Sequence, residues 1–333
     1  MKVISRPTKK INVADLNALN ELLKSGFATK SAFDLLRNKD NEKVINKICL
    51  KLDKGMEIGK IIGEYVPKDI ALYLKPLLKI TSFSRALDMS LSFMNKSREN
   101  NKELEKAILY PFILIFVSLS ALYLFDYYGM DLILEMLKNF TDSTNDIGVI
   151  RNIFRVIIYL FYFLFLIFVI LMFYFLNEKN ITLFYILISK YFPNSLVQTY
   201  FCEDFISLFL ICLNLGYKTK DCLSILKSLH KKPIVSFLAF HLDKKLLEGS
   251  SFKDAGKQNY YDYTLSKFID IAVYTTDFSK IMNDYVTFSR LKIKNKMKKL
   301  TLIIQLSSYM TIGFIIVFIY QILFLPMRAI ANF

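Results

Sequence analysis

Three long stretches without a single charged residue constrain the fold of this chain more than any other feature. They occupy residues 107–125, 156–176 and 301–325. An α-helix needs roughly 20 apolar residues to cross the hydrocarbon core of a bilayer, and a buried helix of a water-soluble protein seldom needs so many. We therefore predict three transmembrane helices. The rest of the chain is polar enough to fold in water, so soluble domains should accompany these helices.

The distribution of charge predicts which segments face the cytoplasm. Residues 1–106 and 177–300 each carry a net charge of +8, whereas residues 126–150 carry −4. Lys and Arg are enriched on the cytoplasmic side of membrane proteins, although Arg151 and Arg155 locally oppose this rule here. We expect cytoplasmic domains at 1–106 and 177–300, an extracytoplasmic loop at 126–155 and an extracytoplasmic C-terminus at 326–333. The predicted protein is multi-pass in a plasma or inner membrane, with a cytoplasmic N-terminus and no cleaved signal peptide.

The same phrase appears twice in the two predicted cytoplasmic segments. Residues 23–36 read "LKSGFATKSAFDLL" and residues 213–226 read "LNLGYKTKDCLSIL", at an offset of 190. Further matching blocks follow in the same order, around Gly55 and Gly249 at an offset of 194, and from Thr81 and Thr276 at an offset of 195. We infer two copies of one domain, each of which leads into a predicted membrane helix.

The repeated phrase has the pattern of a helix that ends in a turn. Apolar residues recur at a helical period before Gly26 and Gly216, and glycine suits the left-handed residue after a helix end. Gly55 and Gly249 are interpreted as corners of the same kind, and Thr29 and Thr219 as N-caps of the next helices. The predicted fold is an all-α membrane protein with two repeated cytoplasmic helical-bundle domains and three transmembrane helices.

Motifs that carry chemistry are missing from the sequence. "GMEIGK" at 55–60 lacks the spacing of a phosphate-binding loop, and only two histidines are present. The four cysteines, Cys49, Cys202, Cys212 and Cys222, match no metal-ligand spacing and are expected to be buried core residues. We predict no enzyme activity, no cofactor and no metal. The predicted spans also lack the ionisable residues that usually mark a transport pathway.

A strongly basic stretch precedes the third uncharged stretch. Its basic side chains are Arg290, Lys292, Lys294, Lys296, Lys298 and Lys299. They are candidates for contact with anionic lipid headgroups, or alternatively with an acidic partner. No nucleic-acid-binding module accompanies the net charge of +15, so direct nucleic-acid binding is not expected. Residues 181–193, which follow the second stretch, either continue its helix or lie at the membrane interface.

This architecture resembles the inner-membrane platform proteins of type II secretion and type IV pilus systems, the GspF/PilC family. The family's "L-x-x-G-hydrophobic" corner is matched at Leu23–Phe27 and at Leu213–Tyr217. A short "eG" element is matched at Glu248-Gly249 and occurs as Lys54-Gly55 in the first copy. The family's proline near the start of a span is matched at Pro111. The family's G-E-x-S-G-x-L element is reduced to "TSFSRAL" and "TDFSKIM". The composition is similar to the competence-pilus (ComGB-like) version of Gram-positive bacteria.

The resemblance implies a platform that performs no chemistry of its own. Its implied partners are a hexameric secretion ATPase in the cytoplasm and the transmembrane helices of pilins or pseudopilins, and it implies a homo-oligomer surrounded by membrane lipids. A small membrane transporter or a signalling receptor is the alternative. The sequence leaves open whether the system serves DNA uptake, adhesion or secretion.

Overall fold

A computed structural model describes residues 10–131, 135, 152, 155–156, 158–160, 162–167, 169–170, 174, 177 and 180–331. All regular elements within these residues are helical, which confirms the predicted all-α class. The chain divides into two compact units. Unit 1 combines Met1–Asn101 with Ile181–Leu291, and unit 2 combines Lys102–Asn180 with Lys292–Phe333.

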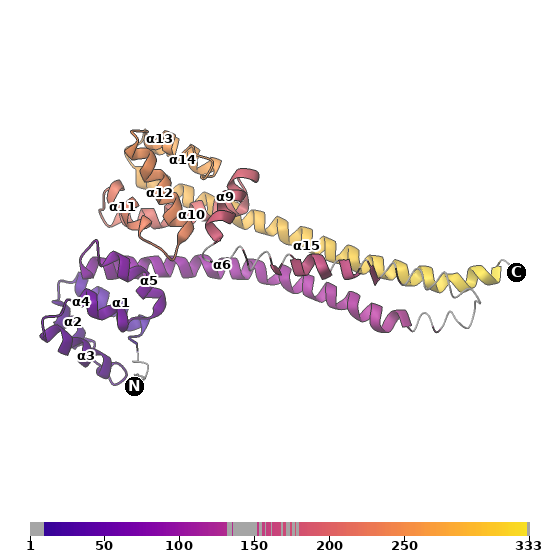
Figure 1. The fold of residues 1–333 in the computed structure, drawn as a ribbon, viewed down its shortest axis with the longest axis horizontal. Coiled ribbons are helices and arrows are strands. Elements are labelled where there is room, and N and C mark those ends of the chain that lie inside the picture. Colours follow the sequence, from indigo (N-terminus) through magenta and orange to yellow (C-terminus); the bar gives the residue numbers. More distant parts are fainter. Residues whose placement is uncertain are drawn as a thin grey trace. The chain divides into compact units, whose positions relative to one another are not determined.

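The first half of unit 1 is a small bundle of short helices (Figure 1). Its elements are α1 (Val13–Lys24), α2 (Thr29–Leu35), α3 (Glu42–Asp53), α4 (Ile58–Ile61), the 3₁₀ turn η1 (Ile62–Glu64), α5 (Lys68–Leu77) and the beginning of α6 (Phe83–Leu124). Each longer helix turns an apolar stripe inward. Leu16 and Leu19 of α1, Phe33 of α2 and Ile48 of α3 are fully or almost fully buried.

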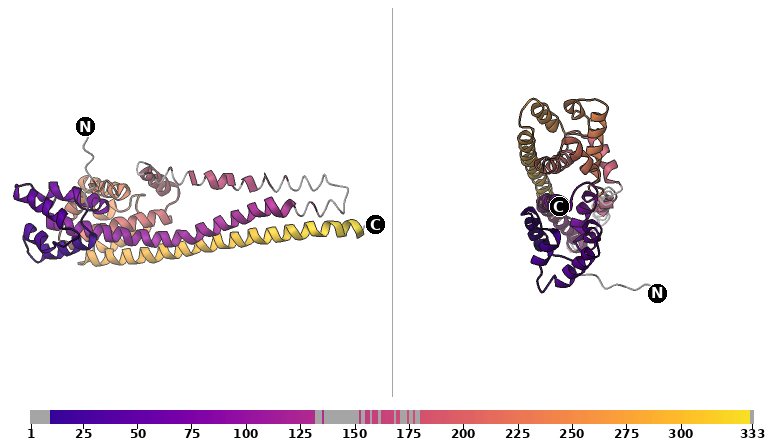
Figure 2. Two further views of the ribbon diagram at one scale, coloured as in Figure 1. Left: turned by 90° about the horizontal axis from the view of Figure 1, so that it is seen from below. Right: turned by 90° about the vertical axis from the view of Figure 1, so that its left-hand side faces the viewer.

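The second half of unit 1 contains a further series of helices, also visible in Figure 2, of which α10 to α15 correspond in order to α1 to α6. They are α9 (Ile181–Tyr191), α10 (Leu196–Asn214), α11 (Thr219–Lys227), α12 (Pro233–Leu247), α13 (Phe252–Ala255), α14 (Tyr263–Ala272) and the beginning of α15 (Phe278–Ala331). Helix α10 lies at the centre of this half, with twelve of its residues buried. The four cysteines are free and buried, which confirms their predicted place in the core.

Four pairs of helices in the two halves begin at the offsets seen in the sequence. Helices α2 and α11 begin 190 residues apart, α4 and α13 begin 194 apart, and α5 and α14 begin 195 apart. Helices α6 and α15 also begin 195 residues apart. The order of helices from α1 to α6 is therefore the order from α10 to α15.

The N-cap prediction for Thr29 and Thr219 is wrong by one residue. Both threonines are already helical, and the cap positions are Ala28 and Lys218, which have extended backbone angles and no capping hydrogen bond from a side chain. The N-cap is the last residue with extended backbone angles before the helix. Both helices therefore begin one residue earlier than the preference of threonine for the N-cap position suggests.

One helix among the described residues, α10, is both long and apolar enough to cross a bilayer. Of its most apolar window, 67% is buried inside the protein, as expected of a core helix. Residues 107–125 fall in α6 and the first residue of the π-helical turn η2 (Phe125–Gly129), and residues 301–325 fall in α15. The structure describes only part of 156–176, and the three transmembrane helices remain a prediction.

In unit 2, the first and second uncharged stretches are in direct contact, and an ion pair lies just outside them. The Tyr162 hydroxyl donates a hydrogen bond to the Leu119 carbonyl oxygen at 2.7 Å. At the end of the first stretch, the Arg155 guanidinium pairs with Asp126 in η2, with Nε 3.2 Å from Oδ1. Arg155, one of the two arginines that oppose the predicted topology, thus pairs with an adjacent carboxylate.

Candidate functional site

The predicted corner glycines lie at equivalent helix ends in the two halves of unit 1. Gly26 follows the C-cap of α1 with φ of 88°, and Gly216 follows the C-cap of α10 with φ of 83°. The amide of Phe27 donates to the Leu22 carbonyl at 3.1 Å, and Gly26 donates to Leu23 at 3.1 Å. These two bonds define a Schellman motif, which satisfies carbonyls that a helix end leaves free.

Gly55 and Gly249 end α3 and α12 in the same way. Their φ angles are 75° and 84°, and each is followed by the same pair of backbone hydrogen bonds. A Cβ added to any of the four corner glycines would meet no atom within 4 Å. The backbone conformation, and not crowding, is therefore the reason for glycine at these positions.

The basic stretch before residue 301 divides into two environments. The side chains of Lys294, Lys298 and Lys299 are exposed and form no ion pair with any described residue, whereas Lys292 and Lys296 are half-buried. Arg290 differs from these lysines because its guanidinium points into unit 1. Arg290 therefore has a partner within the protein, and contact of the five lysines with anionic lipid or an acidic partner stays a prediction.

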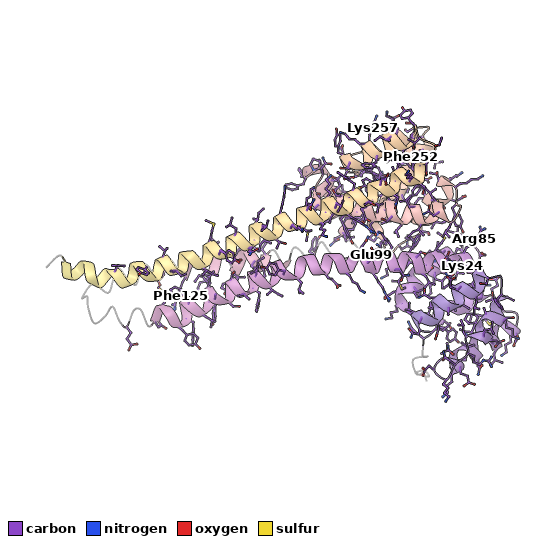
Figure 3. All side chains as sticks on the ribbon, turned by 180° about the vertical axis from the view of Figure 1, so that it is seen from behind. Lys24, Arg85, Glu99, Phe125, Phe252 and Lys257 are labelled. Atoms are coloured by element: carbon purple, nitrogen blue, oxygen red, sulfur yellow. The ribbon has the colours of Figure 1, made fainter. Side chains whose placement is uncertain are left out.

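The partner of Arg290 is Glu203 of α10, which is only 1% exposed. Arg290 Nε lies 3.0 Å from Glu203 Oε1, and Lys96 Nζ of α6 lies 3.4 Å from the same oxygen. Ser207 also donates to this carboxylate at 2.8 Å. Glu99, labelled in Figure 3, lies 3.4 Å from Arg290 Nη1. Burial lowers the pKa of Arg290 from its usual value.

A second ion pair, between the buried Asp204 and the partly buried Lys232, adjoins this one. Lys232, which precedes α12, donates to both oxygens of Asp204 at 2.9 and 2.6 Å. Asn100 of α6 donates to Asp204 and to Glu203 at 3.3 Å each, and so joins the two pairs. Burial lowers the pKa of Lys232, but the negative charge of Asp204 opposes this effect, and the net pKa is raised.

We call these residues the charge cluster. They are Lys96, Glu99, Asn100, Glu203, Asp204, Lys232 and Arg290, with three acidic and three basic side chains. The cluster connects α6, from the first half of unit 1, to α10, α15 and the α11–α12 turn of the second half. Its residues are far apart in sequence and no motif unites them, so sequence reasoning identified only Arg290.

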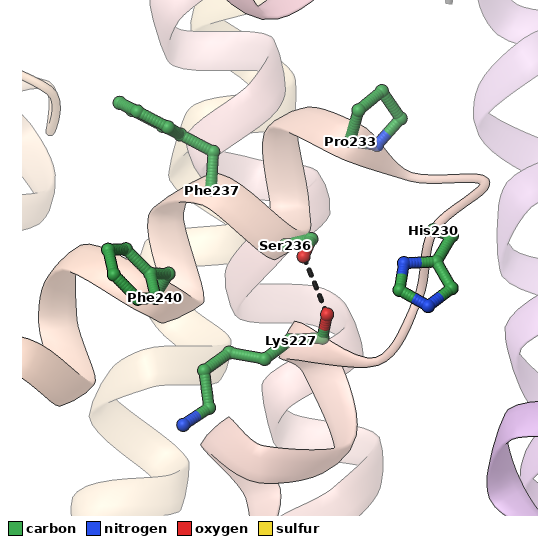
Figure 4. A pocket seen from close by; sticks show the side chains of 6 residues that line it. All are labelled: Lys227, His230, Pro233, Ser236, Phe237 and Phe240. Atoms are coloured by element: carbon green, nitrogen blue, oxygen red, sulfur yellow. Dashed lines mark hydrogen bonds between the residues drawn. The ribbon is translucent and has the colours of Figure 1, made fainter.

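A shallow pocket of about 360 Å³ lies between α11 and α12 (Figure 4). It is lined by Lys227, His230, Pro233, Ser236, Phe237 and Phe240. The Ser236 hydroxyl donates a hydrogen bond to the Lys227 carbonyl oxygen at 2.7 Å and so links α12 to the end of α11. Lys227 pairs with Asp243. Within the described residues, no group of three or more His, Cys, Asp or Glu is placed to hold a metal ion.

The comparisons with known proteins identify one part of the chain. No curated protein matches the sequence. Residues 205–326 match the family model described as type II secretion system (T2SS), protein F. The matched part begins within α10, contains α11 to α14, and extends along α15 through the third uncharged stretch. This part of the chain, from the centre of the second half of unit 1 onward, is similar to protein F of type II secretion systems.

Proposed function

We propose that the chain is a non-catalytic platform protein of a secretion or type IV pilus machine, embedded in the cell membrane. The observation that carries this proposal is the similarity of residues 205–326 to protein F of type II secretion systems. The match includes both a helical domain and the third uncharged stretch, so it unites the soluble and the apolar parts of the proposed architecture.

The first half of unit 1, which lies outside the matched residues, is proposed to be a second copy of the same domain. Its helices occur in the same order as α10 to α15, and from α2 onward the starts of corresponding helices lie 190 to 195 residues apart. The four glycines with positive φ occupy equivalent helix ends. A duplicated domain would give the platform two similar cytoplasmic bundles.

The apolar surfaces of the long helices support membrane insertion. In α6, Phe116 and Val117 are more than half exposed, and in α15 so are Ile303, Leu306 and Met310. Water would disfavour so large an apolar surface, whereas hydrocarbon would not. These exposed apolar surfaces and the charge distribution support three spans with both bundles in the cytoplasm. In this arrangement the five lysines at 292–299 would lie near anionic headgroups.

The proposed partners follow from the resemblance to the platform family. The cytoplasmic bundles would engage a hexameric secretion ATPase, the spans would meet pilin or pseudopilin helices, and several copies would assemble together. The competence-pilus (ComGB-like) assignment, with DNA uptake as its role, is the narrower form of this proposal and rests on composition alone. A transporter or receptor is less well supported, because the predicted spans contain no ionisable residue and the outer loop is short.

Filament assembly in the native cell tests the proposed role. Deletion of the gene should abolish surface filaments or pseudopilus-dependent secretion, while the pilin still accumulates in the membrane. The intact gene supplied in trans should restore assembly. Normal filaments and normal secretion in the deletion strain would contradict the proposal.

A further inference from the structure

Helix α9 presents two apolar faces, of which only one is covered by unit 1. Tyr185 and Ser189 are 0% and 2% exposed and face the second half of unit 1. Leu183, Leu187 and Tyr191 recur every four residues on the opposite face and are 59%, 46% and 65% exposed. Residues four apart on a helix lie above one another, so these three form one continuous stripe.

The buried face fixes the orientation of α9 on the domain. The Tyr185 ring packs edge-on against Phe201 of α10 and Phe237 of α12, with centroids 5.7 and 6.4 Å apart. Its hydroxyl donates to the Tyr260 carbonyl oxygen at 2.5 Å. Because these contacts hold one face, rotation of α9 cannot hide the stripe without breaking them.

Helix α9 begins directly after the second uncharged stretch. A turn separates the two, closed by a hydrogen bond from the Asn180 amide to the Asn177 carbonyl at 2.9 Å. The Asn180 side chain donates to the carbonyl oxygen of Tyr174, within the stretch, at 3.2 Å. Asn177 is in a bend and Asn180 in a turn, so residues 181–193 do not continue the preceding helix. Ile181, the first residue of α9, directly follows Asn180, whose side chain contacts the second uncharged stretch.

The length and composition of α9 fit a helix that lies along a membrane surface. It has 11 residues, or about 17 Å of helix, roughly half of what a span requires. It contains no acidic residue, and its single charge, Lys190, lies near the end of the stripe beside Tyr191. Aromatic residues and lysines at the edge of an apolar face are typical of interfacial helices.

We propose that α9 lies in the interfacial region of the phospholipid bilayer. Leu183, Leu187 and Tyr191 contact the headgroup–acyl boundary, and Lys190 contacts anionic headgroups. The second half of unit 1 is thereby held against the membrane at a second place besides α15. This inference rests on the proposed function, because it requires that residues 156–176 span the membrane.

Single tryptophans report this contact without background, because the chain contains no tryptophan. The full chain is reconstituted in vesicles of phosphatidylcholine and phosphatidylglycerol, with or without bromine near the carbonyl end of the acyl chains. Leu187→Trp is the reporter on the stripe, and Leu306→Trp in the third uncharged stretch reports membrane insertion itself. Tyr274→Trp is the aqueous control, since Tyr274 is 77% exposed and precedes α15. Within α15, about 35 Å of helix separates Phe278 from Thr301, where the third uncharged stretch begins.

The expected result is loss of emission on bromination for Leu187→Trp and Leu306→Trp, and no loss for Tyr274→Trp. Quenching of Leu306→Trp without quenching of Leu187→Trp would overturn the inference and leave membrane insertion intact. Blue-shifted but unquenched Leu187→Trp would likewise overturn it, because a protein would then cover the stripe. Equal quenching of Tyr274→Trp would overturn the preference for α9. Failure of Leu306→Trp to respond would refute the membrane proposal and this inference together.

Discussion

Gly26 ends α1 with φ of 88°, in a conformation that residues with a Cβ rarely adopt, and the space around it is open. We expect Gly26→Ala to lower the free energy of unfolding by about 1–2 kcal/mol, through backbone strain alone. Gly59→Ala is the matched control, because Gly59 lies in α4 and an added Cβ would make only an ordinary contact with Leu78, at 3.7 Å. Denaturant unfolding in mild detergent gives both values, and an equal loss in the two variants would contradict this explanation.

The environment of His241 should make the stability of the protein depend on pH. Its ring centroid lies 4.4 Å from that of Phe237 and 4.7 Å from that of Tyr260. Burial, and then the positive charge of Lys244, lower the pKa of His241. The unfolded chain therefore binds the proton more readily, and stability is lost as the pH falls below about 6.5.

The variant His241→Phe should reduce this loss. We expect the unfolding midpoint of the wild type to fall more than that of the variant between about pH 7.5 and about pH 5.5. A thermal unfolding series in detergent measures the difference. The prediction would be wrong if both proteins lost the same stability over this range.

Local backbone requirements at single residues were predictable to different degrees. Glycine has few reasons to follow an apolar helical period other than a left-handed backbone, so the sequence alone indicated Gly26 and Gly216. Threonine has several uses near a helix start, and Thr29 and Thr219 proved to be first helical residues and not caps. A preference of about 1 kcal/mol is too small to fix a boundary to one residue.

At the scale of helices, the charge cluster is expected to stabilise the contact between the two halves of unit 1. Asp204 is 2% exposed, and its loss would leave the partly buried Lys232 without its carboxylate. We expect Asp204→Ala to cost about 3–5 kcal/mol of unfolding free energy. The control is Asp53→Ala, because Asp53 and Lys30 form an ion pair in which both side chains are about half exposed, and such pairs contribute roughly 0–1 kcal/mol.

A double variant separates the contribution of the Asp204–Lys232 ion pair from a general disruption of packing. Replacing Asp204 with Leu and Lys232 with Met together removes both charges, so the loss should be smaller than that of Asp204→Ala. Urea unfolding of Asp204→Leu, of Lys232→Met and of the double variant measures this coupling. If the double variant lost as much stability as the two single variants summed, Asp204 and Lys232 would not act as a pair.

The helices themselves could be predicted, whereas the contacts between them could not. Periodicity and the repeated glycines identified α1, α10 and the turns after them. The charge cluster brings Asn100 together with Asp204 and Lys232, from three separate elements. Nothing in the local sequence distinguishes these side chains from exposed ones, because only tertiary packing decides their burial.

At the scale of the whole molecule, the topology gives a test that uses the buried native cysteines. All four are buried, so they should react little with a membrane-impermeant maleimide. A cysteine in place of Asp142, in the predicted outer loop, should be labelled in intact cells. A cysteine in place of Lys39, which is exposed in unit 1, should be labelled only after the membrane is opened. Labelling at position 39 but not at position 142 in intact cells would show that the topology is the reverse of the predicted one.

The sequence predicted the helical class and the apolar stretches, and residues 205–326 are similar to a known secretion protein. The packing of the predicted spans with one another and the surface for a proposed partner would depend on other molecules, the lipid and the neighbouring proteins. These features follow from assembly, and a single chain does not contain them.

Co-purification of the tagged chain from its native cell in mild detergent, with the bound proteins identified by mass spectrometry, tests the central claim most directly. An unrelated multi-pass membrane protein with the same tag is the control. We predict recovery of a secretion ATPase and of a pilin or pseudopilin, both absent from the control. Recovery of neither, with subunits of a transporter or signalling complex in their place, would contradict the platform role.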